Sequence, residues 1–253
     1  MEPFQPPVEA VFLDVGGVFH LPNHRLVLNA LRRAGVEADA GRLDRAHYAG
    51  TAALARWPRS REPTEREERI WTAFEEAYAL EVGVPPERLE AALAELDAAF
   101  SAPGMWTRHV PGSLDALRQL AGTGVALAIV SNSDGTLEAR LAAERVCQVG
   151  PGDGVPVAAV IDSGAVGVAK PDPGIFRFAL EATGVEPGRA VHVGDTVGAD
   201  VDGARAAGVQ PLHFDPYGFC PDDSHPHLDD LGALAPLLRP AVASPDPTPP
   251  GVG

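Results

Sequence analysis

The chain has 253 residues, 45% of them hydrophobic, and carries 20 Lys and Arg residues against 35 Asp and Glu residues, a formal net charge of −15. This acidic balance leaves no basic stripe for a phosphate backbone or an anionic membrane surface, which argues against nucleic-acid and membrane partners. No apolar run approaches the roughly 20 residues that cross a bilayer. Cys147 and Cys220 show no metal-type or redox-type spacing, so we expect a cytoplasmic protein with reduced thiols.

Five short and nearly continuous apolar runs predict strands that are buried on both faces. They are residues 10–13, 125–130, 157–161, 190–193 and 211–214. Segments with helical spacing separate the later runs. This alternation predicts an α/β fold with a doubly wound, Rossmann-like parallel sheet.

The segment 20–109 contains no convincing strand, and we expect it to form a separate helical unit inserted after the first strand. Apolar side chains at helical spacing support this unit and are expected in its core, among them Ile70, Trp71, Phe74 and Tyr78. The predicted core domain then comprises 8–19 and 110–238. The proline-rich tail 240–253 is expected to be disordered.

Polar side chains follow the predicted strands, at the edge where the carboxyl ends of parallel strands meet. They are Asp14, Ser131 with Asn132, Lys170, and Asp195 with Asp200 five residues later. Two carboxylates 4 Å apart repel by about 4 kcal/mol at an effective dielectric near 20, so this group needs a cation. Lys170 supplies one positive charge, and all-oxygen ligands suit Mg²⁺ for the remainder. Asp14 is then placed to attack a phosphoryl group as a carboxylate nucleophile.

Lys170 is the single lysine of the chain, which otherwise uses arginine for positive charge. A retained lysine indicates a position that needs a compact, rotatable ammonium instead of a planar guanidinium. Its loop sequence, Gly-Val-Ala-Lys-Pro-Asp, lies between a predicted strand and a predicted helix. We therefore expect Lys170 to sit among carboxylates and the phosphoryl group.

Four segments together resemble the four motifs of the haloacid dehalogenase (HAD) superfamily, in the order of that family. They are Asp14-Val-Gly-Gly-Val, Ser131-Asn132, Lys170-Pro171 and Gly194-Asp195-Thr-Val-Gly-Ala-Asp200. The resemblance covers residues from about 8 to 238. It implies a HAD-like catalytic core with a helical cap of the C1 type inserted after the first motif.

The resemblance also implies a role for each motif residue. Asp14 is the nucleophile, and Ser131 and Lys170 bind the phosphoryl group, with Asn132 beside them. The implied magnesium site comprises Asp14, the carbonyl of Gly16, Asp195 and Asp200, the last of which also supports Lys170. The expected function is that of a Mg²⁺-dependent phosphohydrolase, which acts on a small phosphorylated metabolite through an aspartyl-phosphate intermediate.

Gly16 departs from the usual pattern, because most phosphatases of this family carry a second aspartate two residues after the nucleophile. The usual general acid is therefore missing, and general acid catalysis typically contributes about 10²- to 10⁴-fold. The glycine resembles a subgroup that includes the phosphatase-like N-terminal domain of soluble epoxide hydrolases. His20 follows the first motif closely and is our candidate for a replacement proton donor at the substrate.

Three alternative activities use related residues. A haloacid dehalogenase also has an aspartate nucleophile, but it needs no magnesium and normally has an aromatic residue at the position of Gly16. A phosphonatase requires a lysine in the cap, which this chain does not have because Lys170 lies in the core. A catalytically impaired phosphate-binding or regulatory protein is the third alternative.

The sequence leaves the substrate open. Its identity would depend largely on the cap, whose candidate residues are His20, His24, Arg25, Arg56, Trp57, Arg108 and His109. A monomer and a homodimer are both compatible with the sequence. The helical cap could offer an apolar face for pairing.

Overall fold

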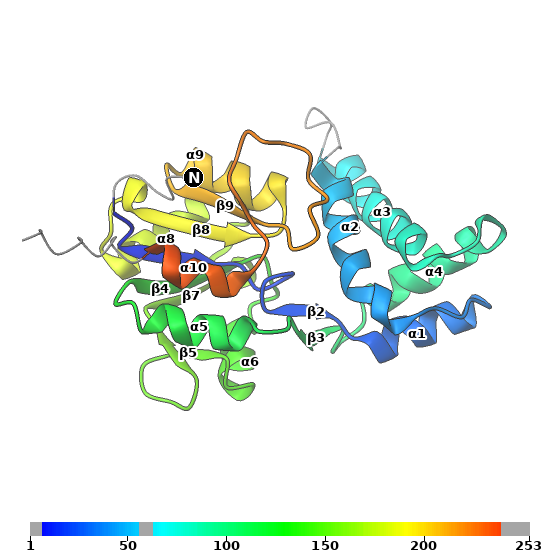
Figure 1. The fold of residues 1–253 in the computed structure, drawn as a ribbon, viewed down its shortest axis with the longest axis horizontal. Helices are drawn as coiled ribbons and strands as arrows, with labels where there is room; N and C mark the ends of the chain where they lie inside the picture. Colours follow the sequence, from blue (N-terminus) through cyan, green and yellow to red (C-terminus); the bar gives the residue numbers. More distant parts are fainter. Residues whose placement is uncertain (1–6, 56–62, 239–253) are drawn as a thin grey trace, which may run out of the picture.

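The computed structural model describes residues 7–55 and 63–238, and for 63–70 the backbone alone. A core built on a sheet lies beside a helical unit, and a narrow two-stranded connection joins them (Figure 1). Among the described residues, no helix combines the length and apolarity needed to cross a bilayer. The predicted disordered tail and the cap candidates Arg56 and Trp57 lie outside the described residues.

A parallel sheet forms the core. Its strands are β1 (Ala10–Leu13), β4 (Ala126–Ser131), β7 (Ala159–Asp162), β8 (Ala190–Gly194), β9 (Gln210–Phe214) and β10 (His227–Leu228). They lie in the order β10-β9-β8-β1-β4-β7, and every neighbouring pair is parallel. The predicted α/β fold with a Rossmann-like parallel sheet is confirmed.

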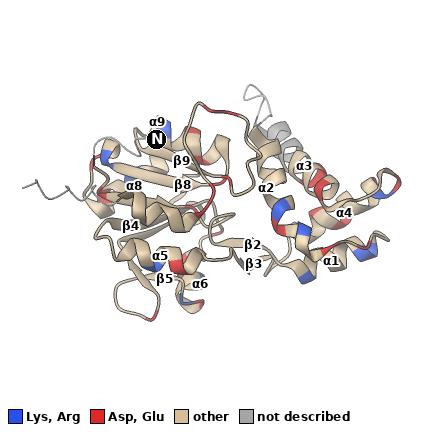
Figure 2. Ribbon diagram, in the orientation of Figure 1, with Lys and Arg blue, Asp and Glu red and all other residues tan. Residues whose placement is uncertain are grey.

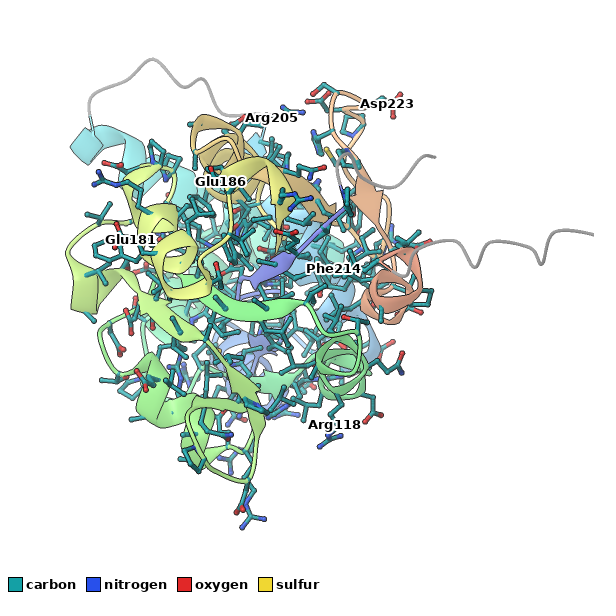
Figure 3. The ribbon with its side chains drawn as sticks, turned by 90° about the vertical axis from the view of Figure 1, so that its left-hand side faces the viewer. Arg118, Glu181, Glu186, Arg205, Phe214 and Asp223 are labelled. Carbon is teal, nitrogen blue, oxygen red and sulfur yellow. The ribbon has the colours of Figure 1, made fainter. Side chains whose placement is uncertain are left out.

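Helices cover both faces of this sheet, as the side chains of β1 demonstrate. Val11 and Leu13 belong to one hydrophobic cluster, whereas Ala10 and Phe12 belong to another, because successive strand residues point to opposite faces. The first cluster includes α5 (Ser113–Ala121), α6 (Leu137–Ala143) and α10 (Leu234–Leu238), and the second includes α8 (Gly174–Thr183) and α9 (Asp202–Ala206). Figure 3 views this two-sided packing from the end of the core, with many side chains between the sheet and its helices.

Shorter elements shape the loops at the strand ends. The predicted strand 157–161 is divided, because Val157 ends β6 (Val155–Val157), which pairs with β5 (Cys147–Val149), and β7 begins only at Ala159. The remaining short elements are α7 (Ser163–Val166), the π-helical turn η4 (Val197–Val201) and the 3₁₀ turns η1 (Ala40–Arg42), η2 (Pro86–Arg88), η3 (Pro187–Arg189) and η5 (Leu231–Ala233).

The helical unit has its own hydrophobic cluster. Its helices are α1 (His24–Arg33), α2 (Leu43–Ala55), α3 (Pro63–Val82) and α4 (Leu89–Phe100). Phe74 and Tyr78 are fully buried in this cluster, as expected, but Trp71 on the same helix is 49% exposed. Figure 2 shows acidic residues along α3 and α4, and the basic residues are scattered over the ribbon.

The prediction that 20–109 contains no strand is wrong at both of its ends. β2 (His20–Pro22) pairs antiparallel with β3 (Trp106–His109), and this ribbon connects the helical unit to the core. The backbone amide of Val110 also donates to the carbonyl of Phe19 over 2.8 Å. Both strands are short and rich in polar residues, so they leave no apolar run in the sequence. They form because two segments about 90 residues apart pair with each other.

Candidate active site

Asp14 follows the last residue of β1 and stays buried, with 8% of its surface exposed. Its backbone amide donates to the carbonyl of Val193 on β8 over 2.9 Å, which fixes the chain where two strands end. Its carboxylate Oδ1 lies 2.9 Å from Lys170 Nζ. Burial raises the pKa of Asp14 to about 6, although the ammonium of Lys170 acts against this rise.

Lys170 is held at both its backbone and its side chain. The Asn132 side chain accepts from the Lys170 amide over 2.8 Å and donates to its carbonyl over 3.0 Å. The ammonium bridges Asp14 and Asp200, with Nζ 2.6 Å from Asp200 Oδ1. Burial alone would lower the pKa of Lys170, but the two carboxylates outweigh burial and raise it. Lys170 is therefore a permanently charged link between these acids.

Asp200 lies on η4 and is almost completely buried. Its Oδ1 is in contact with Lys170 and with His192 Nε2 at 2.9 Å, and its Oδ2 accepts from the Thr196 hydroxyl and amide at 2.5 and 3.0 Å. Burial acts to raise the pKa of Asp200, but Lys170 and the donated bonds hold it well below its usual range. Because protein donors hold both oxygens, Asp200 is better suited to support the site than to bind a metal directly.

Asp195 meets a group that the sequence analysis did not identify, His47 of α2. His47 Nε2 lies 2.8 Å from Asp195 Oδ2, and both side chains are buried. The loop after β1 lies so close to Asp195 that position 17 requires a glycine. Its φ is +66°, and a Cβ there would lie 1.9 Å from Asp195 Oδ2. Helix α2 thus brings the helical unit directly to the edge of the candidate site.

Asp14 and Asp195 offer oxygen ligands that fit a divalent cation, with Asp200 beside them. One carboxylate oxygen from each of Asp14, Asp195 and Asp200 lies within 4.8 Å of the others, and all three residues are buried. Among the described residues, Lys170 is the one cation that contacts two of these three acids. Hard oxygen donors with an excess of negative charge suit Mg²⁺. The carbonyl of Gly16, the fourth expected ligand, belongs to the turn that follows Asp14.

A cavity of about 760 Å³ opens over these residues. Its polar floor includes Asp14, Ser131, Lys170 and Asp195 from the core. Its opposite wall comes from the helical unit and the ribbon, and includes His47, Leu54, Trp71, Phe74 and Trp106. Ser131 ends β4, is 4% exposed and lines the same cavity as the nucleophile candidate. The sequence predicted these strand-end residues to lie together, and the structure brings them together.

His20 lines the same cavity but lies in a different polar cluster. Its Nε2 is 2.8 Å from Glu144 Oε2, yet neither atom makes a hydrogen bond among the described residues, and its ring packs edge-on against His109. Burial, with His109 and Arg140 nearby, lowers the pKa of His20 to about 4. The ring is therefore neutral at physiological pH, so a role as proton donor would depend on a change of its surroundings.

The other cap candidates within the described residues do not line the cavity. Arg108 and His24 share the carboxylate of Asp44, each at 2.7 Å. Arg25 is exposed on α1. Through Asp44, His24 and Arg108 therefore connect α1, α2 and β3 within the helical unit.

Known proteins resemble this chain in sequence and fold. The family model of haloacid dehalogenase-like hydrolases matches residues 8–208. The phosphoserine phosphatase of Thermus thermophilus is 35% identical over 225 residues, which cover 80% of this chain and 86% of that protein. The human haloacid dehalogenase-like hydrolase domain-containing protein 3 is 37% identical over 62% of this chain and 61% of its own length.

Solved structures share the fold at much lower identity. The HAD hydrolase YfnB of Bacillus subtilis, crystallised with magnesium bound, has a TM-score of 0.55 at 15% identity, over 92% of this chain and 99% of that one. At this identity the likeness supports the fold alone. The matched family model and the 35% identical relative also show the family. The chain therefore belongs to the haloacid dehalogenase-like hydrolase family and is a hydrolase.

Proposed function

We propose that this hydrolase is a Mg²⁺-dependent phosphohydrolase, which acts on a small phosphorylated metabolite through an aspartyl-phosphate intermediate. The observation that carries the proposal is the buried Asp14 carboxylate, paired with Lys170 at 2.9 Å on the floor of the cavity and grouped with Asp195. Relatives named as phosphatases, including phosphoserine phosphatase, support the same reaction class.

In the proposed first step, Asp14 attacks phosphorus through the carboxylate oxygen that Lys170 does not hold. A bond forms from this oxygen to phosphorus while the bond from phosphorus to the leaving-group oxygen breaks. Lys170 and the Ser131 hydroxyl would hold the phosphoryl oxygens as negative charge builds up on them. Asn132 acts indirectly, because its amide clamps the backbone of Lys170.

Magnesium, when bound by Asp14, Asp195 and the carbonyl of Gly16, would offset the negative charge of nucleophile and substrate. In the second step, a water oxygen bonds to phosphorus while the bond from phosphorus to the Asp14 oxygen breaks. One proton of this water stays on the released inorganic phosphate, the other passes to solvent, and Asp14 returns as a free carboxylate. Gly16 offers no side chain to protonate the leaving group, so that proton comes from water. Substrates with good leaving groups should therefore react fastest.

We propose that segment 20–109 acts as the cap of this enzyme and that 8–19 and 110–238 form its catalytic core. The wall that the helical unit contributes is mainly apolar and aromatic, with Trp71, Phe74 and Trp106. A small substrate with an apolar or planar portion beyond its phosphate would match this wall.

The test is release of phosphate from p-nitrophenyl phosphate, with and without Mg²⁺, by the full chain and by Asp14→Asn. We expect magnesium-dependent turnover that Asp14→Asn abolishes. The control Asp115→Asn changes an exposed acid that pairs with Arg118 on α5, and it should keep the wild-type rate. A panel of phosphorylated metabolites then identifies the preferred substrate.

Two outcomes would replace the proposal with an alternative. Release of chloride from a 2-chlorocarboxylic acid in the absence of magnesium, without phosphatase activity, would indicate a dehalogenase. Saturable phosphate binding with no turnover of any activated phosphate would indicate a phosphate-binding protein.

A further inference from the structure

The strand β9, the loop that follows it and the start of β10 gather three imidazoles and one thiol, from His213, Cys220, His225 and His227. One ligand atom of each residue lies within 4.8 Å of all the others. We propose that these residues form a zinc-type metal site, separate from the carboxylate site, which fixes the loop 215–226 to the core. The two cysteines show no metal-type spacing in the sequence, because the partners of Cys220 are histidines that lie before and after it in the chain.

Two of the distances between ligand atoms are close to those of a tetrahedral zinc site. His213 Nδ1 lies 3.0 Å from His225 Nε2, and Cys220 Sγ lies 3.8 Å from the same nitrogen. Zinc binds nitrogen at about 2.0–2.1 Å and sulfur at about 2.3 Å, so tetrahedral angles place two nitrogens roughly 3.3 Å apart and nitrogen and sulfur roughly 3.6 Å apart. His213, Cys220 and His225 would need small shifts to surround one ion, and the His227 ring, which stacks on that of His225 at 4.6 Å, would have to turn toward it.

The outward nitrogens of the three rings face oxygen atoms. His213 Nε2 lies 3.1 Å from the Asp195 carbonyl, and His227 Nε2 lies 3.0 Å from the Asp222 carbonyl. His225 is buried, and its Nδ1 has no hydrogen-bond partner among the described residues, although the Asp222 carboxylate is 3.7 Å away. Histidines that bind metals typically donate their second N–H to such oxygens, which would direct His213 Nδ1 and His225 Nε2 to the ion. His227 Nδ1 lies 3.7 Å from the Asp215 carboxylate and would exchange this contact for the ion.

The ligand chemistry distinguishes this site from the carboxylate site. Imidazole and thiolate ligands suit zinc, whereas magnesium prefers oxygen. On binding, the S–H bond of Cys220 would break, its proton would pass to solvent, and an S–metal bond would form.

The loop that carries the ligands also contacts the helical unit. The guanidinium carbon of Arg45 on α2 lies 4.4 Å from the ring centre of Phe219, and the Tyr48 ring is 5.6 Å from that of Tyr217. A bound ion would therefore position a loop that supports α2 on one side, and through His213 the backbone of Asp195 on the other. Asp223 marks the outer edge of this loop in Figure 3.

The experiment measures tightly bound metal in the full chain after exposure to Zn²⁺ and desalting. We expect about one zinc per chain in the wild type, and Co²⁺ in its place should give the visible absorption of a tetrahedral site with a thiolate charge-transfer band. Cys220→Ser should lose that band, and His225→Ala should lose the metal. Asp195→Asn alters the carboxylate site but leaves the four ligands intact, so it should retain both metal and band.

Circular dichroism establishes that each variant is folded, and a thermal scan adds a second readout. Chelation should lower the Tm of the wild type but leave that of the Cys220→Ser and His225→Ala double variant unchanged. Equal zinc content in wild type and double variant would overturn the proposal, as would a thiolate band that survives in Cys220→Ser. Metal that is lost in His109→Ala instead would assign the ion to the cluster of His20, His109 and Glu144. None of these readouts depends on phosphatase activity.

Discussion

At the scale of single residues, Lys170 is the residue whose chemistry is most constrained. Its Nζ contacts Asp14 at 2.9 Å and Asp200 at 2.6 Å inside a buried cluster, a geometry that suits a compact ammonium on a narrow stem. The wider guanidinium of Lys170→Arg would push these acids apart. We expect kcat to fall at least 10²- to 10³-fold, as when one preorganised donor is removed.

The measurement is magnesium-dependent hydrolysis of p-nitrophenyl phosphate. Arg177→Lys, an exchange of the same two residue types on the exposed side of α8, serves as the control and should change kcat little. A Lys170→Arg variant with nearly normal turnover would show that the site needs only a positive charge.

A second prediction at the residue scale concerns Gly16, where a substitution should increase activity. A Cβ added at Gly16 would meet no atom within 4 Å, so a side chain can start there without displacing a neighbour. Gly16→Asp would supply the acid that most phosphatases of the family carry at this position. We expect kcat for a substrate with a poor leaving group, such as an alkyl phosphate, to rise at least 10-fold toward the range of about 10²–10⁴ for general acid catalysis.

The matched control is Gly16→Asn, which has the same shape and no acid. It should give no comparable gain. If both variants accelerate the reaction equally, the effect of the aspartate is not proton transfer. For p-nitrophenyl phosphate, whose leaving group needs little protonation, Gly16→Asp should change the rate much less than for an alkyl phosphate.

The site residues differ in how far the sequence could locate them. Asp14, Ser131 and Asp195 follow apolar runs, and the carboxyl ends of parallel strands meet, so their proximity could be predicted from the order of residues alone. His47 could not be located, because no pattern on a helix indicates which turn will reach another domain. The roles of all these residues in catalysis stay predictions that the variants test.

At the scale of elements, α2 adds side-chain contacts between the helical unit and the core to the connection that the ribbon makes. The Tyr48 hydroxyl donates to the Gly17 carbonyl over 2.6 Å, beside the turn that carries Asp14. Tyr48→Phe would leave a buried carbonyl without its donor. We expect the free energy of unfolding to fall by about 1–3 kcal/mol, measured by urea denaturation.

Tyr78 on α3 offers a control of the same chemistry. Its hydroxyl is buried and has no hydrogen-bond partner among the described residues. Tyr78→Phe removes an unsatisfied group, so its stability should stay unchanged or rise slightly. A loss of equal size in both variants would argue that the bond from Tyr48 to Gly17 contributes nothing.

The two-stranded ribbon shows why elements differ in predictability. The strand β1 and the strand β8 are apolar throughout most of their length because they lie in the middle of the sheet, and this composition is visible in the sequence. The ribbon of β2 and β3 is short, contains His20, Pro22 and Arg108, and exists because two distant segments meet. Local composition carries little information about such a pairing.

At the scale of the whole molecule, the fold class followed from local patterns, whereas the arrangement of its two parts did not. Alternating apolar runs and helical segments specified the parallel sheet, and the long interval at 20–109 indicated an insertion. The position of the helical unit depends on long-range contacts such as that between His47 and Asp195. The cluster around Cys220 also became visible only when β9 and its loop were folded together.

The stability of the whole chain should depend on pH through Glu75 of the helical unit. Burial, with Asp97 nearby, raises the pKa of Glu75 from 4.5 to about 7. Between these values the unfolded chain has released this proton while the folded chain retains it. The folded state therefore binds more protons there, and the free energy of unfolding falls as pH rises from about 4.5 to 7.

Glu75→Gln removes this ionisation and keeps the shape of the side chain. The variant should be more stable than the wild type above pH 7, by on the order of 1–2 kcal/mol, and the difference should vanish below about pH 4.5. Its neighbour Glu76 is exposed, so Glu76→Gln should leave the pH dependence unchanged. Urea denaturation at several pH values measures the free energy of unfolding of both variants and of the wild type. A Glu75→Gln curve parallel to that of the wild type would mean that Glu75 stays ionised in the folded protein, with its charge satisfied by a neighbouring group.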